Sequence, residues 1–592
     1  MQGYLSLIGL GSVGMSIGFS YGFCSLCGLS YGPLHNIIPF LLLGIGIDDM
    51  FVTMQCFDNL SPSDCHRPLK DRFGLTMSRA GCAITVTSLT DFLAFAIGGT
   101  TVLPALQSFC IFCAVGLIVV YILQATWFVA WFSLDQRRIE AGRNGSLVCY
   151  THKDFQPNKF SQRNILQTLF KHLAKVVITV PGKAAVISLS LVFLGFSVWG
   201  NILLRQEFNP IWFLPPESYL AQWHSHNSQY FPSRGEEVTV FLAGLDLPRE
   251  LETLDRVHSI LNHQTDIIAP NSLDSWYLDF KTYVNLNFDA GLPEREMGEE
   301  EFESRLTQFL FSPSGSKHRF LINFNNTLQC GEAASRMELA MLTFTHRLMD
   351  GPKEQIPAMN RVKDILKTAN FSGKVFPMCK GYASWETDEV ISIELYRNIF
   401  LAIICVFLTT WVLLFNIWAS LQVLACVVLT LVNVGGFIHF WGLTIDTVSC
   451  TNIIISIGLC VDYSAHIAHA FMSSEGSREE RVITALVDIG PAVLNGGFST
   501  FLAFVLLAGS KSHVFATFFK VFFLVVLFGL FNGLLLLPVV MSFIGPASYG
   551  QRALEKKQLG DRNSEEEVAP FKPIIKNGSA AVNGEETGTV TL

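Results

Sequence analysis

Two acidic motifs stand inside long apolar stretches of the sequence. Gly44-Ile-Gly-Ile-Asp48-Asp49 and Gly458-Leu-Cys-Val-Asp462 have the same spacing from glycine to aspartate and lie 414 positions apart. An ionisable group near the centre of a bilayer costs about 3 kcal/mol or more, so it is retained where it faces a partner, a cavity or an ion path. The spacing therefore predicts a duplicated membrane-spanning helix whose acids relay protons or ions.

Asp48 is the stronger relay candidate of the first motif, because Asp462 is its counterpart and Asp49 points about 100° away on the same helix. The alternative is a carboxylate that only joins helices through neighbouring Ser or Thr. His466 lies four residues after Asp462 and shares its helix face. It could pair with that acid or extend the relay, and an ordinary histidine near the cytosolic interface is the equal alternative.

A third acid, Asp91, lies in the middle of another apolar stretch, and its counterpart in the second half is Thr500. Two interpretations are open, because nearby hydroxyls could satisfy the carboxyl locally or the acid could belong to the relay. Small residues let helices approach closely, so packing is the favoured role of the motif glycines. The hydroxyl residues are Thr85, Thr87, Ser88 and Thr90, and the glycines are Gly44, Gly46 and Gly458.

The composition of the chain indicates that these motifs lie in a membrane. Of 592 residues, 50% are hydrophobic and only 15% charged, and the mean hydropathy is +0.39, which is typical of a polytopic membrane protein. The net charge of −8 gives no reason to expect a nucleic-acid partner. Ten stretches are long enough to span a bilayer, namely 4–27, 33–54, 83–100, 106–132, 184–204, 395–415, 417–440, 446–471, 488–508 and 514–544.

The loop at 133–183 fixes the orientation, because its nine Lys and Arg face only three acids and the positive-inside rule makes it cytosolic. Residues 205–393 then form an extracytosolic domain, whose mixed strand-like and helix-like stretches predict an α+β fold. This region holds glycosylation sequons at Asn325 and Asn370. Its two cysteines, Cys330 and Cys379, could form a single disulfide. The tail at 546–592 is polar and predicted to be cytosolic and disordered.

The two halves of the sequence repeat one another beyond the acidic motifs. Gly28-Leu-Ser matches Gly442-Leu-Thr at the offset of 414, and Phe92-Leu-Ala-Phe95 matches Phe501-Leu-Ala-Phe504 at an offset of 409. The first four spans, residues 1–132, therefore correspond to the last four. The span at 184–204 and the first of the five spans in 394–545 bracket the outer domain and have no counterpart. We expect an N-terminally shortened version of a twelve-span design with two outer domains.

Parallel repeats place polar sites near the bilayer midplane, where the two halves meet. Asp48, Asp49 and Asp462 should therefore approach one another at that interface.

Several motifs in order resemble the sterol-sensing domain of Patched-type proteins. They are Gly44-x-x-x-Asp48-Asp49, Ile84-Thr-Val-Thr-Ser-Leu-Thr-Asp-Phe-Leu-Ala-Phe95 and Ser133-Leu-Asp-x-Arg137-Arg138. The stretch Phe208-Asn-Pro-Ile-Trp-Phe-Leu-Pro-Pro-Glu-Ser-Tyr219 resembles the Patched-related, or patched domain-containing, branch. The resemblance implies the resistance-nodulation-division (RND) superfamily, with relatives among Niemann-Pick type C sterol transporters and Dispatched.

The resemblance implies translocation of a sterol or other membrane lipid, driven by a proton or monovalent cation. Asp48 and Asp49 match the first acidic motif of the family, and Asp462 matches the second. Only four of the usual five sterol-sensing spans and one of two outer domains are present. The alternatives are therefore a receptor or scaffold whose outer domain binds a protein ligand, as in Hedgehog-type signalling, or a shortened inactive isoform.

No catalytic constellation, metal-ligand spacing or nucleotide motif is found, so we expect neither an enzyme nor a cofactor. An integral protein of the plasma membrane is favoured, with an endomembrane as the alternative location. An oligomer is compatible with the sequence.

Overall fold

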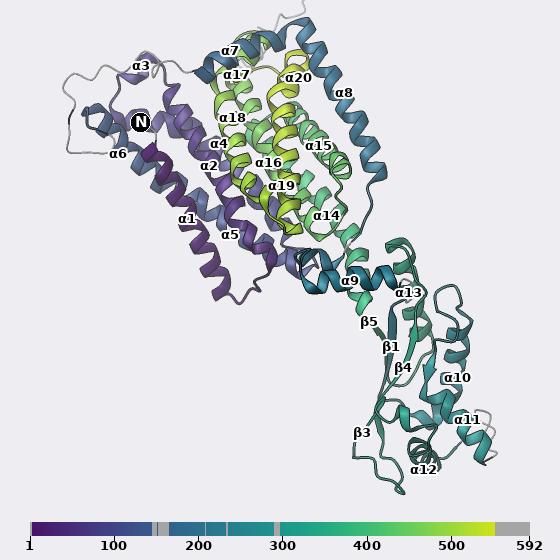
Figure 1. Ribbon diagram of the computed structural model, residues 1–592. Helices are drawn as coiled ribbons and strands as arrows, with labels where there is room; N and C mark the ends of the chain where they lie inside the picture. The colour runs from purple at the N-terminus through teal and green to yellow at the C-terminus, as the bar shows by residue number, and fades with distance from the viewer. Residues whose placement is uncertain are drawn as a thin grey trace, which may run out of the picture.

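The computed structural model describes residues 3–144, 151, 165–207, 209–231, 235–288 and 297–550. A bundle of long helices forms most of the molecule, and a smaller domain of strands and helices projects from one end of it (Figure 1). The N-terminus lies at the opposite end of the bundle (Figure 1). The predicted tail from 551 onward and much of the basic loop, at 145–150 and 152–164, lie outside the described residues.

The prediction of ten spans is confirmed, since ten helical segments in the described ranges are long and apolar enough to cross a membrane. Two of them pass through a π-helical turn. The helices are α1 (Gly3–Leu26), α2 (Ile38–Asp58, after η1 Pro33–Ile37), α4 (Leu69–Gly98), α5 (Pro104–Leu123) with η2 (Gln124–Phe128) and α6 (Val129–Glu140), α8 (Val180–Leu203), α14 (Lys380–Leu414), α15 (Ile417–Phe440), α16 (Thr447–Ser473), α18 (Gly490–Val505) with η5 (Leu506–Gly509), and α19 (His513–Phe531) with η6 (Asn532–Leu536) and α20 (Leu537–Ile544).

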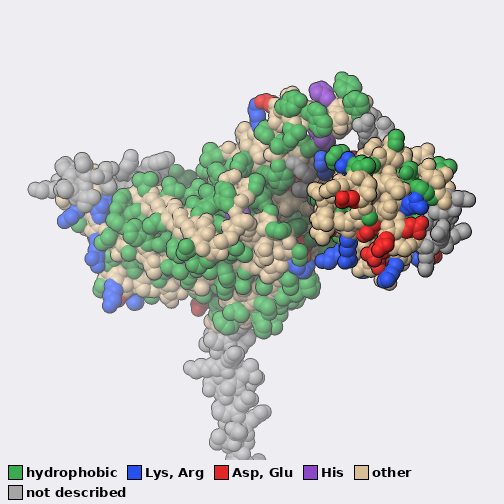
Figure 2. Space-filling model, turned by 90° about the horizontal axis from the view of Figure 1, so that it is seen from below, with side chains coloured by type: hydrophobic (Ala, Val, Ile, Leu, Met, Phe, Trp, Pro, Cys, Tyr) green, Lys and Arg blue, Asp and Glu red, His purple; other side chains and the backbone are tan. Residues whose placement is uncertain are grey.

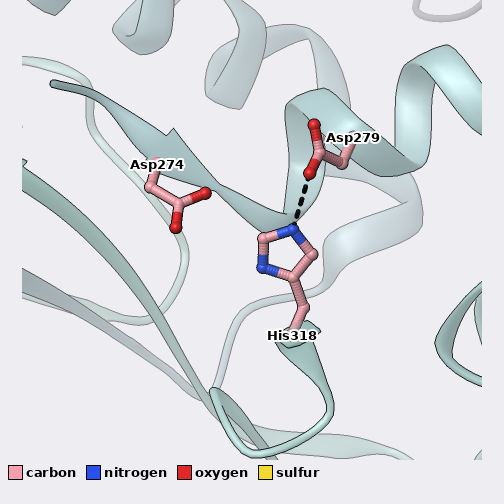
Figure 3. A group of neighbouring side chains, drawn as sticks. All are labelled: Asp274, Asp279 and His318. Carbon is pink, nitrogen blue, oxygen red and sulfur yellow. Dashed lines mark hydrogen bonds and ion pairs between the residues drawn. The ribbon is translucent and has the colours of Figure 1, made fainter. Parts of the chain in front are cut away.

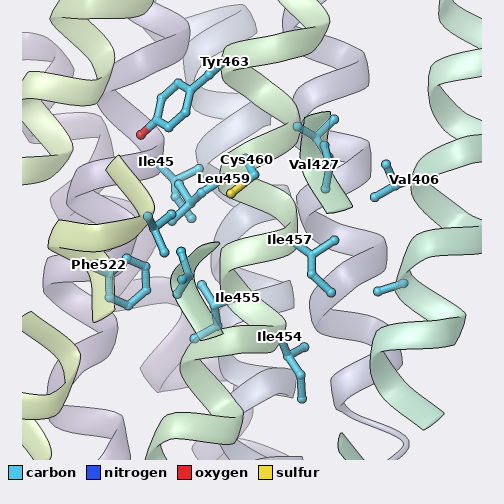
Figure 4. Packing of buried hydrophobic residues seen from close by; sticks show 14 of the residues in the cluster. Ile45, Val406, Val427, Ile454, Ile455, Ile457, Leu459, Cys460, Tyr463 and Phe522 are labelled. Carbon is cyan, nitrogen blue, oxygen red and sulfur yellow. The ribbon is translucent and has the colours of Figure 1, made fainter. Parts of the chain in front are cut away.

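Helix α16 is the centre of the bundle, because every residue from Thr447 to Ala468 is buried. Apolar side chains of the surrounding helices close over it, including Ile45 of α2, Val427 of α15 and Phe522 of α19 (Figure 4). Hydrophobic side chains also cover much of the visible flank of the bundle, whereas acidic ones gather on the outer domain (Figure 2). An apolar flank of this kind is what a lipid environment requires.

The halves of the bundle cross-pack. Helix α4 of the first half packs on α16 of the second, and α18 of the second half packs on α2 of the first. In each case the third helix of one repeat covers the acid-bearing helix of the other. The acids predicted to meet between the halves therefore do lie on helices that form this interface.

Helix α14 begins at Lys380, fifteen residues before the apolar stretch that starts at 395. Its first turns carry Tyr382 and Trp385, which are buried in the core of the outer domain. Hydropathy detects only the lipid-facing part of such a helix. The turns of α14 that extend into the outer domain are therefore not predicted as part of the span. Three helices too short to span a membrane lie at the end of the bundle away from the outer domain (Figure 1), namely α3 (Pro62–Cys65), α7 (Ile165–Ile178) and α17 (Arg478–Asp488).

The outer domain is built on a five-stranded antiparallel sheet in the order β2-β4-β1-β5, with β3 also paired to β4. Helices α10 and α13 cover one face, where Val240, Leu254 and Val362 share a core separate from that of the bundle. The domain is made of twelve elements in chain order. They are η3 (Pro210–Phe213), α9 (Tyr219–Tyr230), β1 (Glu237–Ala243), α10 (Leu247–His263), β2 (Asp274–Ser275), α11 (Trp276–Phe288), α12 (Glu299–Leu310), η4 (Ser316–His318), β3 (Ile322–Phe324), β4 (Met337–Thr345), α13 (Pro352–Thr368) and β5 (Lys374–Cys379).

The disulfide considered from the sequence is not formed, because Cys330 and Cys379 are both free. Cys379 ends β5 in a buried position, where its Sγ accepts from the Gly381 backbone N–H at 3.3 Å. Cys330 is exposed in the loop between β3 and β4. Both sequon asparagines, Asn325 and Asn370, are exposed, and their glycosylation stays a prediction.

Candidate functional site: a cluster of membrane acids

The two neighbouring acids of α2 face different helices, as their spacing on a helix requires. A carboxyl oxygen of Asp48 lies where a side chain on Gly496 of α18 would begin. Asp49 is buried, and its Oδ2 accepts a hydrogen bond from the Ser88 hydroxyl of α4 at 3.2 Å. Asp48 Oδ1 is enclosed without a hydrogen-bond partner. One helix thus presents acid to both halves of the bundle.

Asp91 of α4 is buried against Gly458 of α16, and its Oδ1 occupies the space that a β-carbon there would need. Neither carboxyl oxygen has a hydrogen-bond partner. The nearby hydroxyls do not satisfy the acid, which corrects that alternative: Thr87 donates to Ala83 and Ile84, and Thr90 donates to the Thr87 carbonyl. In a helix these hydroxyls have a backbone carbonyl within reach one turn earlier.

Asp462 of α16 completes the cluster. It is buried, its Oδ1 has no hydrogen-bond partner, and it interacts electrostatically with Asp91, Asp48 and Asp49. Across the described ranges, no Lys, Arg or His forms an ion pair with any of the four acids. The structure therefore brings together the three acids expected to meet between the halves and adds Asp91 to them.

His466 is buried one turn after Asp462 on the same helix. No ion pair joins the two side chains in the part of the chain that the structure describes. The paired arrangement considered from the sequence is therefore not formed here. A role for His466 in the relay stays a prediction.

The three motif glycines lie at helix contacts. A β-carbon on Gly44 would come within 3.1 Å of Thr500 Cγ2, and one on Gly46 would come within 2.9 Å of Val120 Cγ1. The Thr500 hydroxyl also donates to the Gly44 carbonyl at 3.2 Å. At Gly458 the absent side chain makes room for an acid instead, so this glycine serves the cluster as well as the packing.

The chemistry open to the cluster follows from its composition. Four carboxyl groups without a protein cation cannot all be ionised in an apolar interior, because an unpaired buried charge is strongly unfavourable. They can be neutralised by protons or by a bound monovalent cation. Carboxyl oxygens without partners are the atoms that would accept either one.

A second polar group lies in the outer domain, where His318 of η4 stands between Asp274 of β2 and Asp279 of α11 (Figure 3). One ligand atom from each side chain lies within 4.8 Å of the others. His318 Nε2 is 2.8 Å from Asp279 Oδ2, and Lys317 Nζ is 2.9 Å from the same oxygen and 3.5 Å from Asp274 Oδ1. The ammonium thus takes the position between the carboxylates that a metal ion would need.

These contacts also set the charge of Asp279. Burial raises its pKa, but the hydrogen bonds from His318 and Lys317 outweigh burial, and the net pKa lies below its usual value. The carboxylate is therefore held ionised beside the Lys317 ammonium and the His318 ring. This group is best described as an ion-pair cluster that joins η4 to α11.

Several residues of the membrane site were not found from the sequence. Gly496 contacts Asp48 but carries no charge, so nothing in an apolar stretch distinguishes it. Ser88 was considered as a partner of Asp91, but it donates to Asp49 instead. Two buried amides, Gln124 and Asn532, would have been detectable as polar residues in apolar stretches, 408 positions apart.

The fold and the acid cluster define a multi-pass membrane protein with acids between two repeated halves. Comparisons with known proteins show which families its regions resemble. Residues 1–152 match the family described as the sterol-sensing domain of SREBP cleavage-activation. Residues 335–563 match the MMPL family. The chain is a multi-pass membrane protein with a region similar to sterol-sensing domains in its first half and a region similar to the MMPL family in its second.

Three known proteins illustrate the relationship. The chain is 24% identical to the NPC intracellular cholesterol transporter 1 of Sus scrofa, over 96% of this chain and 49% of that protein. It is 22% identical to Protein patched homolog 3 of Caenorhabditis elegans, over 92% of this chain and 46% of that protein. The cryo-EM structure of the hedgehog release protein Disp from the water bear Hypsibius dujardini shares the fold, with a TM-score of 0.68, 15% identity, and coverage of 92% of this chain and 68% of that one. The chain spans about half the length of the first two relatives.

Proposed function

We propose that the chain moves a sterol or another membrane lipid and couples this to a proton or monovalent cation that passes Asp48, Asp49, Asp91 and Asp462. One observation carries the proposal. Four carboxyl groups meet at the interface between two repeated halves, and three of them, Asp48, Asp91 and Asp462, have buried oxygens without a hydrogen-bond partner. Relatives named as cholesterol transporters support a sterol as the lipid.

The position of the acids supports coupling rather than simple binding. Asp91 of the first half lies on Gly458 of the second, and Asp48 of the first half lies on Gly496 of the second. Neutralising or charging either carboxyl changes the interaction across the interface directly. An ion that favours one arrangement of the halves over the other would shift their equilibrium, as alternating access requires.

The test is transport by the full chain in sealed proteoliposomes. Movement of a fluorescent sterol between leaflets or to acceptor vesicles is measured with and without a proton or sodium gradient. Asp462→Asn should lower the gradient-dependent rate by about tenfold or more, because it removes a protonatable group from the path. Asp364→Asn, an equal change at an exposed site of the outer domain, is the control. Unchanged transport by correctly folded Asp462→Asn would reject the role assigned to this acid.

A second candidate, a receptor for a protein ligand, is favoured by the open face of the outer sheet. Phe241 and Phe376 stack there with ring centroids 5.4 Å apart, and Phe376 and Met378 are 47% and 61% exposed. An apolar surface of this kind often marks a protein interaction site. If the chain is a receptor, Phe376→Ser with Met378→Ser should remove ligand capture by the full chain, while Asp462→Asn should keep it. The opposite pattern would favour the transporter.

A further inference from the structure

Two π-helical turns occupy equivalent places in the two repeats. The turn η2 follows α5, the fourth helix of the first repeat, and η6 follows α19, the fourth helix of the second. Each turn begins with a buried amide residue, Gln124 in one half and Asn532 in the other. Single π turns inside helices are uncommon and occur often at functional sites.

In the first half, Gln124 joins three helices. Its Nε2 donates to the Ser12 hydroxyl of α1 and to the Gly46 carbonyl of α2, both at 3.0 Å. Ser12 in turn donates to the Gly9 carbonyl at 2.7 Å. Gly46 lies two residues before Asp48, so the amide holds the acid-bearing helix at the level of its acids.

The second half repeats this arrangement with different residues. Asn532 Nδ2 donates to the Thr430 hydroxyl of α15 at 2.8 Å, and Thr430 donates to the Cys426 carbonyl at 2.8 Å. The next residue, Gly533, packs against the backbone of Tyr463. A β-carbon added to Gly533 would lie 3.0 Å from the Tyr463 carbonyl carbon. Tyr463 directly follows Asp462, so this π turn also touches the acid-bearing helix beside its acid.

The nitrogen of each amide donates to a neighbouring helix, and the oxygen of each amide has no hydrogen-bond partner. Gln124 Oε1 and Asn532 Oδ1 are both buried without a hydrogen-bond partner. A buried acceptor without a partner is unfavourable, so two at equivalent places require an explanation. A water molecule, a hydrated proton or a monovalent cation beside the acids would satisfy an amide oxygen, which is a good ligand for each of them.

We propose that Gln124 and Asn532 are positioning residues of the acid cluster and that each offers an amide oxygen to water or to the passing cation. Gln124 bonds the acid-bearing helix α2 directly, whereas Asn532 fixes on α15 the π turn whose Gly533 packs on the acid-bearing helix α16. The use of these oxygens in transport rests on the proposed function, whereas the positioning of the acids rests on the contacts alone. Because each amide braces its own half, its removal should affect the acids of that half first.

The experiment measures how fast a hydrophobic carbodiimide modifies each acid of the full chain in lipid nanodiscs, by mass spectrometry at one pH. Such reagents modify protonated carboxyl groups in apolar surroundings. Gln124→Met should raise the rate at Asp48 and Asp49 by about three- to tenfold, the effect of losing one or two buried hydrogen bonds, and change the rate at Asp462 by less than about twofold. Asn532→Leu should show the reverse pattern.

Gln422→Met is the control, because Gln422 is a buried amide of α15 that donates to the Ile544 carbonyl and lies outside the π turns. Gln124→Asn and Asn532→Gln retain the amide and should restore part of the wild-type pattern. Rates near the wild-type value, lower rates, or equal rises at all acids would overturn the proposal. The crossed pattern without ion-dependent transport would reject the proposed function and retain the positioning role, and transport without the crossed pattern would do the opposite.

Discussion

The two halves of the bundle make the same contact with different chemistry. In one direction, Asp91 of α4 lies on Gly458 of α16, and in the other, its counterpart Thr500 of α18 lies on Gly44 of α2. The threonine hydroxyl donates to the Gly44 carbonyl, whereas the aspartate oxygens have no partner. The repeat has kept the shape of the interface, and only one copy of this contact carries an acid.

The two halves also contribute unequal numbers of acids to the cluster. Three of the four, Asp48, Asp49 and Asp91, come from the first half, and Asp462 alone comes from the second. A symmetric fold can thus hold an asymmetric ion site. The neutral contact shows what the interface needs for packing, and the contact with Asp91 carries an acid beyond that need.

The largest effect is expected when the neutral contact is given an acid. Thr500→Asp would bury a fifth carboxyl near four others and remove the hydrogen bond to Gly44, so it should destabilise the fold by about 3 to 5 kcal/mol. Thr500→Val, which keeps the shape, should cost only about 1 kcal/mol. Thermal unfolding of the purified full chain in detergent compares them. Similar stability of the two variants would show that the contact does not distinguish acid from neutral residues.

The reverse exchange should lower transport and not stability. Asp91→Thr copies the second half, removes a buried carboxyl without partners and should leave the unfolding temperature equal or higher. The gradient-dependent transport rate should fall by about tenfold, because one proton or cation acceptor is lost. A variant with normal transport would place Asp91 outside the ion path.

A smaller effect should distinguish the two glycines under these contacts. A methyl group on Gly458 would overlap the Asp91 carboxyl, so Gly458→Ala should cost about 2 kcal/mol through overpacking. On Gly44 it would come within 3.1 Å of the Thr500 methyl, and Gly44→Ala should cost less than about 1 kcal/mol. Unfolding of both variants, measured together, gives the difference. Equal costs would contradict the tighter contact at the acid.

The smallest expected effect is a pH dependence of stability in the outer domain, which contrasts this domain with the bundle. Burial lowers the pKa of His258 and of His346 in the folded domain. Both stay neutral there, with His258 Nε2 2.6 Å from the Ser275 hydroxyl. The unfolded chain binds protons below about pH 6.5 that the folded domain does not, so stability is full above that pH and falls as the pH drops through it.

Hydrogen exchange of β1 and β4 in the full chain should therefore show a loss of about 1 kcal/mol per histidine between pH 7.5 and 5.5. His258→Gln should reduce the pH dependence of the outer sheet and leave that of the bundle unchanged. Protection that is constant across this range would mean that the buried histidines take up protons without cost.

The sequence predicts the ten spans, their pairing into repeats and the acids between the halves, because hydropathy, motif spacing and the rarity of membrane charge report these directly. It leaves open whether Asp91 is satisfied locally, since Thr87 and Thr90 can reach either the carboxyl or a backbone carbonyl, and only the fold decides. The sequence also does not predict the role of Gly496, because its contact with Asp48 depends on how α18 crosses α2. The early start of α14 depends on Tyr382 and Trp385 joining a core that hydropathy does not register.

Ion uptake in the presence and absence of a lipid acceptor tests the central claim most directly. Proteoliposomes that contain the full chain, a fluorescent sterol and an internal pH or sodium indicator are supplied with acceptor vesicles under an imposed ion gradient. We predict that ion entry accelerates when sterol leaves and that both processes fall together in Asp91→Asn and Asp462→Asn. Sterol movement that continues at the wild-type rate in either variant, without ion entry, would contradict coupling through the acid cluster.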